Sequence, residues 1–202
     1  MTHTLHRSGT PGSLSRDYPV MILRAVGFND EGFQDKCREF LRIAARHHPV
    51  NLASEMKGNI FEFSLEEILA DTRGDSYAVF VSSEDLTGFL IDLREADLGL
   101  SVVVSGDFDA VQQCLRAAEL RWHTANFSLG IIGRTDLLPD EGILDIVTMC
   151  GHGMVPAKLV KKMVDEIHAG RMTPEAAANL LARNCTCGVF NPVRAAELLA
   201  KC

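Results

Sequence analysis

The sequence predicts an α/β protein: a layered sheet with helices packed on it, followed by an all-helical C-terminal appendage. Two observations support this fold class. From Tyr77 onward, short apolar runs suited to buried strands alternate with amphipathic helical patterns, an order typical of parallel pairing. After residue 150 only helical patterns follow. A ferredoxin-like and a flavodoxin-like sheet, both built from βαβ units, fit this order, and the element lengths do not choose between them.

The strands and helices of the sheet domain are expected in a definite order. The first part has a strand over residues 19–26, a helix over 30–47, a short strand over 59–63 and a helix over 64–70. The last of these begins with a capping box, in which Ser64 and Glu67 satisfy each other's backbone amides. The regular part has strands over 77–81, 100–104 and 123–132, helices over 82–98 and 107–120, and a final strand over 143–149.

Three regions follow from these patterns. Residues 1–17 are rich in Ser, Thr, Gly and His and are expected to be a disordered lead-in. Residues 18–150 form the sheet domain, and residues 151–202 form the helical appendage. Within the appendage, proline and threonine signals open helices over 156–169, 173–183 and 191–199.

Composition limits the classes of partner. The chain has 202 residues, 47% of them apolar and 23% charged, which is ordinary for a globular protein with a proper core. Its formal charge of −7, without a run of Lys or Arg, argues against nucleic acid and anionic membranes as partners. No apolar run approaches the ~20 residues of a membrane span, and the first residues lack the apolar segment of a secretory signal. We expect a cytoplasmic protein that acts on a small molecule, with a homo-oligomer possible.

Two short turns concentrate the cysteine chemistry of the chain. The first is Met-Cys-Gly-His-Gly-Met-Val-Pro over 149–156, and the second is Asn-Cys-Thr-Cys-Gly-Val-Phe-Asn-Pro over 184–192. When the two are superimposed, Cys150 matches Cys185 and His152 matches Cys187. Each turn has a glycine beside its ligands and a proline that opens the next helix. Such turns bend sharply and are then held rigid, as a ligand site requires.

Metal binding is the first interpretation of these turns. Cys150, His152, Cys185 and Cys187 supply three sulfurs and one nitrogen, a set that suits a tetrahedral zinc ion. The set also suits a [4Fe-4S] cluster, with the fourth iron held by His152 or left open for substrate. The sequence therefore predicts a metal- or iron–sulfur-dependent enzyme of the lyase or hydrolase type, whose metal is a Lewis acid for a small polar substrate. A non-catalytic metal site that staples the appendage to the sheet is an alternative.

Metal-free thiol chemistry is a further alternative. The helices that begin after the turns, together with His152, are expected to lower the pKa of a facing cysteine. Residues 149–153 resemble the Met-Cys-Gly-His-Gly motif of the proline racemase and hydroxyproline epimerase family, in which the cysteine is an acid/base on the substrate α-carbon. The resemblance covers these five residues and implies an acid/base role for Cys150, paired with His152. The remaining interpretation is that the cysteines are small buried residues.

Other polar residues are candidates for substrate contact. Arg134 follows the expected strand over 123–132, and strand ends that share one edge of a parallel sheet bring it near Cys150. Asn191 and Arg194, at the start of the last helix, are also expected to contact substrate. By contrast, Cys37 and Cys114 lie in helical patterns and are expected to be core residues.

Overall fold

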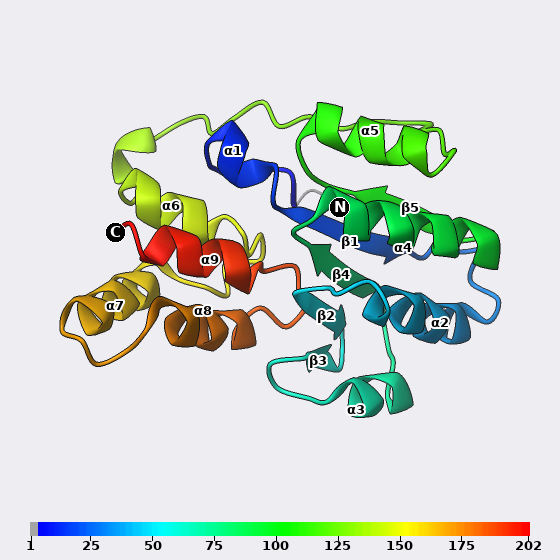
Figure 1. Cartoon of the computed structure of the whole chain (residues 1–202), viewed down its shortest axis with the longest axis horizontal. Helices are drawn as coiled ribbons and strands as arrows, with labels where there is room; N and C mark the ends of the chain where they lie inside the picture. The colour runs from blue at the N-terminus through cyan, green and yellow to red at the C-terminus, as the bar shows by residue number, and fades with distance from the viewer. Residues whose placement is uncertain (1–3) are drawn as a thin grey trace.

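The computed structural model describes residues 4–202, and its sheet half contains five strands and five helices. These are α1 (Pro11–Leu14), β1 (Tyr18–Leu23), α2 (Phe33–Ala45), β2 (Asn51–Ser54), β3 (Gly58–Asn59), α3 (Leu65–Ala70), β4 (Ser76–Phe80), α4 (Ser83–Ala96), β5 (Ser101–Val104) and α5 (Phe108–Ala117). The C-terminal half contains a 3-10 turn (Thr135–Leu137), α6 (Glu141–Val147), α7 (Ala157–His168), α8 (Pro174–Arg183) and α9 (Pro192–Leu199). The predicted α/β fold with C-terminal helices is confirmed (Figure 1).

The five strands form one sheet in the order β3-β2-β4-β1-β5, and every neighbouring pair is antiparallel. The expected parallel pairing is therefore wrong. The fold contains two strand–helix–strand units, β1-α2-β2 and β4-α4-β5. The two strands of each unit are not neighbours in the sheet: β4 lies between β1 and β2, and β1 lies between β4 and β5. This is the split βαβ arrangement of ferredoxin-like sheets. A flavodoxin-like sheet would need parallel neighbours.

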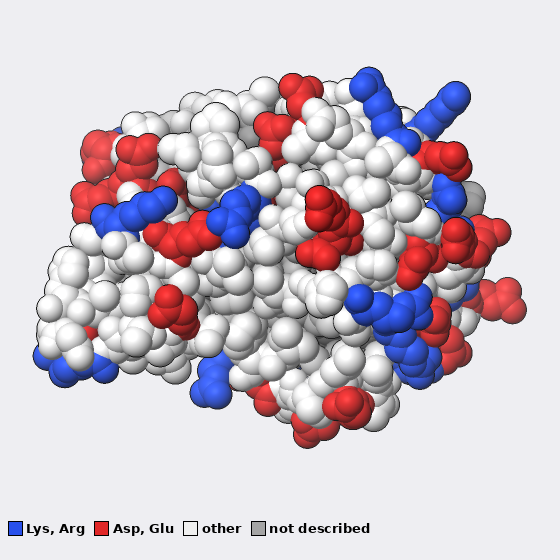
Figure 2. Space-filling model, in the orientation of Figure 1, with Lys and Arg blue, Asp and Glu red and all other residues white. Residues whose placement is uncertain are grey.

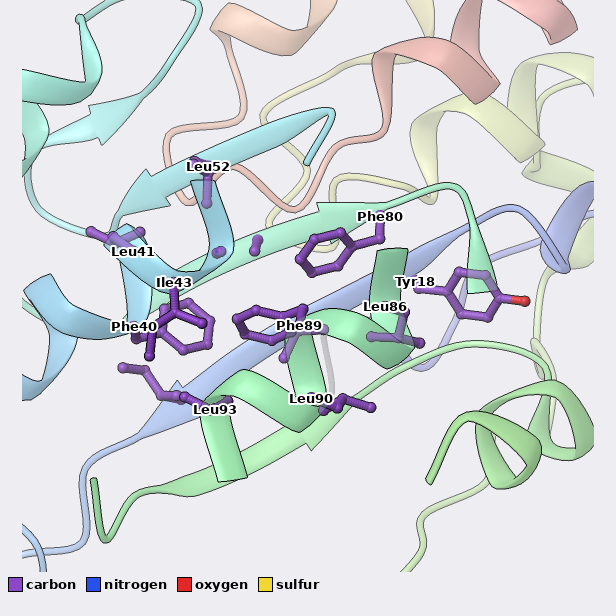
Figure 3. Close-up of a cluster of buried hydrophobic side chains, with 14 of the residues drawn as sticks. Tyr18, Phe40, Leu41, Ile43, Leu52, Phe80, Leu86, Phe89, Leu90 and Leu93 are labelled. Atoms are coloured by element: carbon purple, nitrogen blue, oxygen red, sulfur yellow. The ribbon is translucent and has the colours of Figure 1, made fainter. Parts of the chain in front are cut away.

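The two faces of the sheet are buried under different helices. Side chains alternate along β1, so Val20 and Ile22 point to one face and Met21 to the other. The first face packs against α2 and α4 through an aromatic cluster (Figure 3). There the ring of Phe89 lies 5.4 Å from that of Phe40 and 5.0 Å from that of Phe80. This core anchors the sheet independently of the C-terminal helices.

The second face of the sheet shares a core with the C-terminal helices. Met21 of β1 and Tyr77 of β4 belong to the same buried cluster as Val160 of α7, Leu181 of α8 and Phe190. The C-terminal helices lie together beside the sheet in Figure 1, and this cluster makes them a second layer on it. No helix within residues 4–202 combines the length and the apolar composition that crossing a bilayer requires.

Two expected strands are absent. Residues 143–147 belong to α6, whose Ile143 and Ile146 are spaced three apart and buried on one helical face, and Met149 is buried just beyond the end of the helix. Residues 123–132 form neither strand nor helix. Conversely, β2 lies between the helix expected over 30–47 and the strand expected over 59–63, where the sequence pattern predicts no definite element. The strand expected over 59–63 is replaced by the two residues of β3, Gly58–Asn59.

The N-terminal segment is ordered where the structure describes it. Residues 1–3 lie outside the described residues, whereas residues 4–17, expected to be disordered, contain α1 and a buried ion pair between Arg7 and Asp17. Their order comes from long-range contacts with residues more than 130 positions later in the chain, for example between Ser8 and Thr148. Local composition does not report such contacts.

Candidate functional site

The four residues of the two turns come together at the junction between the sheet and the C-terminal helices. Cys150 follows α6, and Cys185 and Cys187 lie between α8 and α9. The sulfurs of Cys185 and Cys187 are 3.9 Å apart, and the sulfur of Cys187 is 3.5 Å from Nδ1 of His152. Cys185 is also the group that most strongly affects the pKa of Cys150. All three cysteines are at most 2% exposed, whereas His152 is exposed.

The two turns share one backbone geometry. The amide of Gly153 donates to the carbonyl of Cys150 at 2.9 Å, and the amide of Gly188 donates to the carbonyl of Cys185 at 2.8 Å. Both glycines have φ of +68°, a conformation that side chains with a Cβ rarely adopt. The correspondence between the two turns is therefore structural as well as sequential.

The environment of Cys150 favours its thiolate. The hydrogen bond from the Cys185 thiol is the largest influence, and together with the amides of Met154 and His152 it lowers the pKa of Cys150 to about 6 in spite of burial. The same contact raises the pKa of Cys185, as do its contact with Cys187 and its burial. Two adjacent buried sulfurs resist a second negative charge, so ionisation of Cys150 opposes that of Cys185.

Tyr77 is a neighbour of this cluster that sequence patterns did not single out. It lies on β4 and is 3% exposed. Burial chiefly raises the pKa of its hydroxyl, and Glu55, Asp75, Cys187 and Cys185 add to the effect. The sulfurs therefore lie within electrostatic reach of the sheet surface. In the sequence Tyr77 looks like any aromatic residue of a buried strand.

Two buried asparagines attach the second turn to the sheet. Asn59 of β3 donates through Nδ2 to the carbonyls of Ala182 and Cys185, at 3.1 and 2.9 Å. Asn51 of β2 donates in the same way to the carbonyl of Phe190, at 2.9 Å. Both asparagines are fully buried, and these bonds satisfy carbonyls that would otherwise lose water without compensation.

Arg7 joins the two turns from the N-terminal segment. Its Nη2 donates to the carbonyl of Met149 at 3.2 Å and to that of Val189. Its Nη1 forms two bonds with the carboxylate of Asp17, at 2.7 and 2.6 Å. One guanidinium thus bridges the first residue of the first turn and Val189 of the second turn, and it is held in place by a buried carboxylate.

The residues predicted to contact substrate have other partners. Asn191 caps α9 by accepting from the amide of Arg194 at 3.0 Å, and it donates to Asp17. Arg194 is 1% exposed, and its guanidinium donates to Asp17, Ser13 and the carbonyl of Ser8. Both side chains hold the N-terminal segment against α9. Their hydrogen-bonding capacity is used within the fold.

Arg134 lies apart from this network. It is exposed and forms a two-bond ion pair with Asp136, at 2.8 and 2.6 Å. The expected shared edge with Cys150 does not exist, because residues 123–132 are not a strand and Cys150 follows a helix.

The other cysteines are placed as the sequence suggested. The thiols of Cys37 and Cys114 are buried, and each lies 3.6 Å from a backbone carbonyl, that of Gly74 or Ser83. Burial raises the pKa of Cys37 to about 11, so this thiol stays protonated. Cys202 is exposed at the end of the chain.

As it stands, the cluster is not a complete coordination shell. Within residues 4–202, no group of three or more Cys, His, Asp and Glu side chains is arranged so that it could hold a metal ion. The four side chains form a row and not a shell. Cys150 interacts with Cys185, the sulfur of Cys185 lies near that of Cys187, and the sulfur of Cys187 lies near His152.

Comparisons of this chain with protein-family models, with curated proteins and with solved structures found no match. Function is therefore inferred from the chemistry of the site itself.

Gly188 provides a test of how closely the second turn must approach the sheet. A Cβ at this position would lie 2.5 Å from that of Ala53 in β2, so Gly188→Ala should lower the free energy of unfolding by about 2–4 kcal/mol in urea titrations. Gly170→Ala is the matched control, because Gly170 has the same φ of +68° but no atom within 4 Å of the added methyl. It should lose only about 1 kcal/mol. Equal losses would show that the close approach is unimportant.

Asp17 provides a test of the buried ion network. Asp17→Asn leaves the guanidiniums of Arg7 and Arg194 without their counter-charge, so we expect a loss of about 3–5 kcal/mol in the free energy of unfolding. Glu197→Gln removes the ion pair between Glu197 and Arg16, which has the same 2.6 Å length. The side chain of Arg16 is 51% exposed and that of Glu197 is 41% exposed. This control should lose less than about 1 kcal/mol. A similar small loss in both variants would contradict the role assigned to Asp17.

Proposed function

We propose that the cysteine cluster is a thiol-based acid/base centre in which the Cys150 thiolate is the base and Cys185 is its proton-sharing partner. The observation that carries the proposal is the close grouping of the side chains, with 3.9 Å between the sulfurs of Cys185 and Cys187 and 3.5 Å from Cys187 to His152. Hydrogen bonding, chiefly with Cys185 and also with the amides of Met154 and His152 as donors, lowers the pKa of Cys150. A cysteine with such donors is poised as a thiolate at neutral pH, which is the reactive form.

The second pair, Cys187 and His152, supports the same chemistry. A thiol 3.5 Å from an imidazole can exchange a proton with it, and His152 is exposed where the cysteines are not. In the proposed step, Cys150 takes a proton from the substrate and becomes a thiol. A neighbouring thiol then gives its proton to the substrate anion and takes up the proton that Cys150 holds, so Cys150 is again the thiolate. His152 can pass protons between Cys187 and water.

The substrate class is a small polar molecule that approaches over the exposed residues 151–154. Glycines on either side of His152 leave this approach with little side-chain bulk. The reduced thiols that the proposal needs are those of a reducing compartment such as the cytosol.

Binding of a single metal ion is the second candidate: the described side chains do not form a complete ligand group as they stand, but two of their separations match zinc geometry. A tetrahedral zinc ion with ordinary bond lengths places two sulfur ligands about 3.8 Å apart and a sulfur and a nitrogen about 3.6 Å apart. The separations here are 3.9 Å between Cys185 and Cys187 and 3.5 Å between Cys187 and His152. Such spacing suits one ion better than a [4Fe-4S] cluster, whose irons and sulfides must fit between the ligands. Bound there, the ion would be a Lewis acid for a lyase or hydrolase step, or a structural staple.

Titration of the thiolate absorbance near 240 nm tests the first proposal. In metal-free, reduced protein, one thiolate should appear as the pH rises through about 6, and it should be missing in Cys150→Ser. In Cys185→Ser the thiolate should remain with a shifted pKa, because the hydroxyl replaces the thiol as donor. Cys114→Ser, at a buried cysteine outside the cluster, is the control and should leave the titration unchanged. No thiolate below pH 8 would refute the proposal.

Metal titration separates the two candidates. If the cluster binds one ion, Co²⁺ should give thiolate charge-transfer absorbance at one equivalent per chain, and zinc should displace it. Cys187→Ser should abolish this signal, whereas Cys37→Ser should not. If the protein retains the 240 nm titration but gives no charge-transfer band, metal binding is refuted and the acid/base proposal stands.

A further inference from the structure

The outer side of β5 makes no backbone hydrogen bond with another segment of residues 4–202. β5 is an end strand of the sheet, and its Ser-Val-Val-Val sequence has none of the charges or prolines that usually protect such an edge. The amide of Ser105 donates to the carbonyl of Pro19 at 2.8 Å, and the register pairs Val104 with Val20. Because inward and outward groups alternate in an antiparallel pair, Val102 and Val104 direct their N–H and C=O groups away from β1.

A groove follows this edge. Its volume is about 840 Å³, and it is lined by β5, by apolar side chains of α4 and α5, by part of the N-terminal segment and by the stretch from Trp122 to Ser128. One residue of a strand packed in a sheet occupies roughly 160 Å³, from its rise and from the distances to neighbouring strands and layers. The groove therefore has room for about five residues of extended chain.

The chain also carries a segment suited to such a groove. Residues 123–133 contain no charged side chain and cross the top of the molecule between α5 and α6 as uncharged surface (Figures 1 and 2). Apolar residues dominate the end of this segment, where Leu129 is 87% exposed, Ile131 45% and Ile132 83%. Such exposure of adjacent large apolar residues is typical of a protein interface.

The start of the segment is tied to the rim of its own groove. The ring of Phe127 lies 5.2 Å from that of Phe108, and Ser128 is hydrogen-bonded to His6 at 3.0 Å. Residues 129–132 lie beyond this attachment and do not line the groove. They are thus placed to reach another molecule.

We propose that this face joins two copies of the chain, with residues 129–132 of each copy added as a strand along β5 of the other. Gly130, whose φ is +81° in the single chain, would become extended on pairing. The outward N–H and C=O groups of Val102 and Val104 would bond to the added strand, and Leu129, Ile131 and Ile132 would leave water. The exchange is reciprocal, so the same surface of both copies is used and the assembly closes as a dimer. This inference is independent of the function proposed for the cysteines.

The oligomeric state of the full chain tests the proposal. Light scattering with size-exclusion chromatography should give a dimer for the unmodified protein, and Leu129→Asp should weaken dimerisation at least about a hundredfold because it buries a charge. Leu129 is exposed in the single chain, so the variant should fold, which circular dichroism checks. Phe28→Asp is the matched control, since Phe28 is 93% exposed but lies outside this face, and it should remain dimeric. A monomeric unmodified protein, or a dimer that survives Leu129→Asp, would overturn the proposal.

Hydrogen exchange distinguishes strand exchange from other contacts. The amides of Val102 and Val104 should be protected in the dimer and should exchange rapidly in Leu129→Asp. Protection of both amides in a monomer would mean that the chain's own segment fills the groove, and fast exchange in the dimer would mean that the copies meet elsewhere. Either result rejects the proposed pairing.

Discussion

The carboxylate of Asp17 is the interaction on which the arrangement of the cysteine turns depends. It is fully buried, and it accepts from Arg7, Arg194 and Asn191 at once. Taking these charges out of water is costly, and the cost is offset only because each group has close partners of the right kind. Arg7, fixed in this way, reaches the carbonyls of both turns. The N-terminal segment is thus a structural part of a site formed more than 130 residues later.

The sheet is the second determinant of the site. Because neighbouring strands are antiparallel and both faces are covered, the C-terminal helices become a layer of the fold with a shared core. Asn51 and Asn59 attach the second turn to this layer, and Gly188 permits the close approach to β2. The backbone of the turn is therefore held from the sheet side, and its thiols face the first turn.

The chemistry of the cluster follows from this confinement. Buried thiols that lie close together cannot all lose their protons, so hydrogen bonding decides which sulfur ionises first. The interaction with Cys185 lowers the pKa of Cys150 and raises that of Cys185. We propose proton exchange as the chemistry of this cluster, with binding of a single ion as the second candidate.

Sequence patterns by themselves determined the α/β class, most helix positions, the capping box at Ser64 and the pairing of the two cysteine turns. They did so because these features depend on periodicity, caps and glycines, which are local. Strand direction, the helix at α6 and the roles of Asn191, Arg194 and Arg7 were decided only by the tertiary structure. Whether a strand pairs with its neighbour in sequence, or whether an arginine is buried beside a distant carboxylate, depends on contacts between segments far apart in the chain. No local pattern records these contacts, and here they place every residue that supports the cysteines.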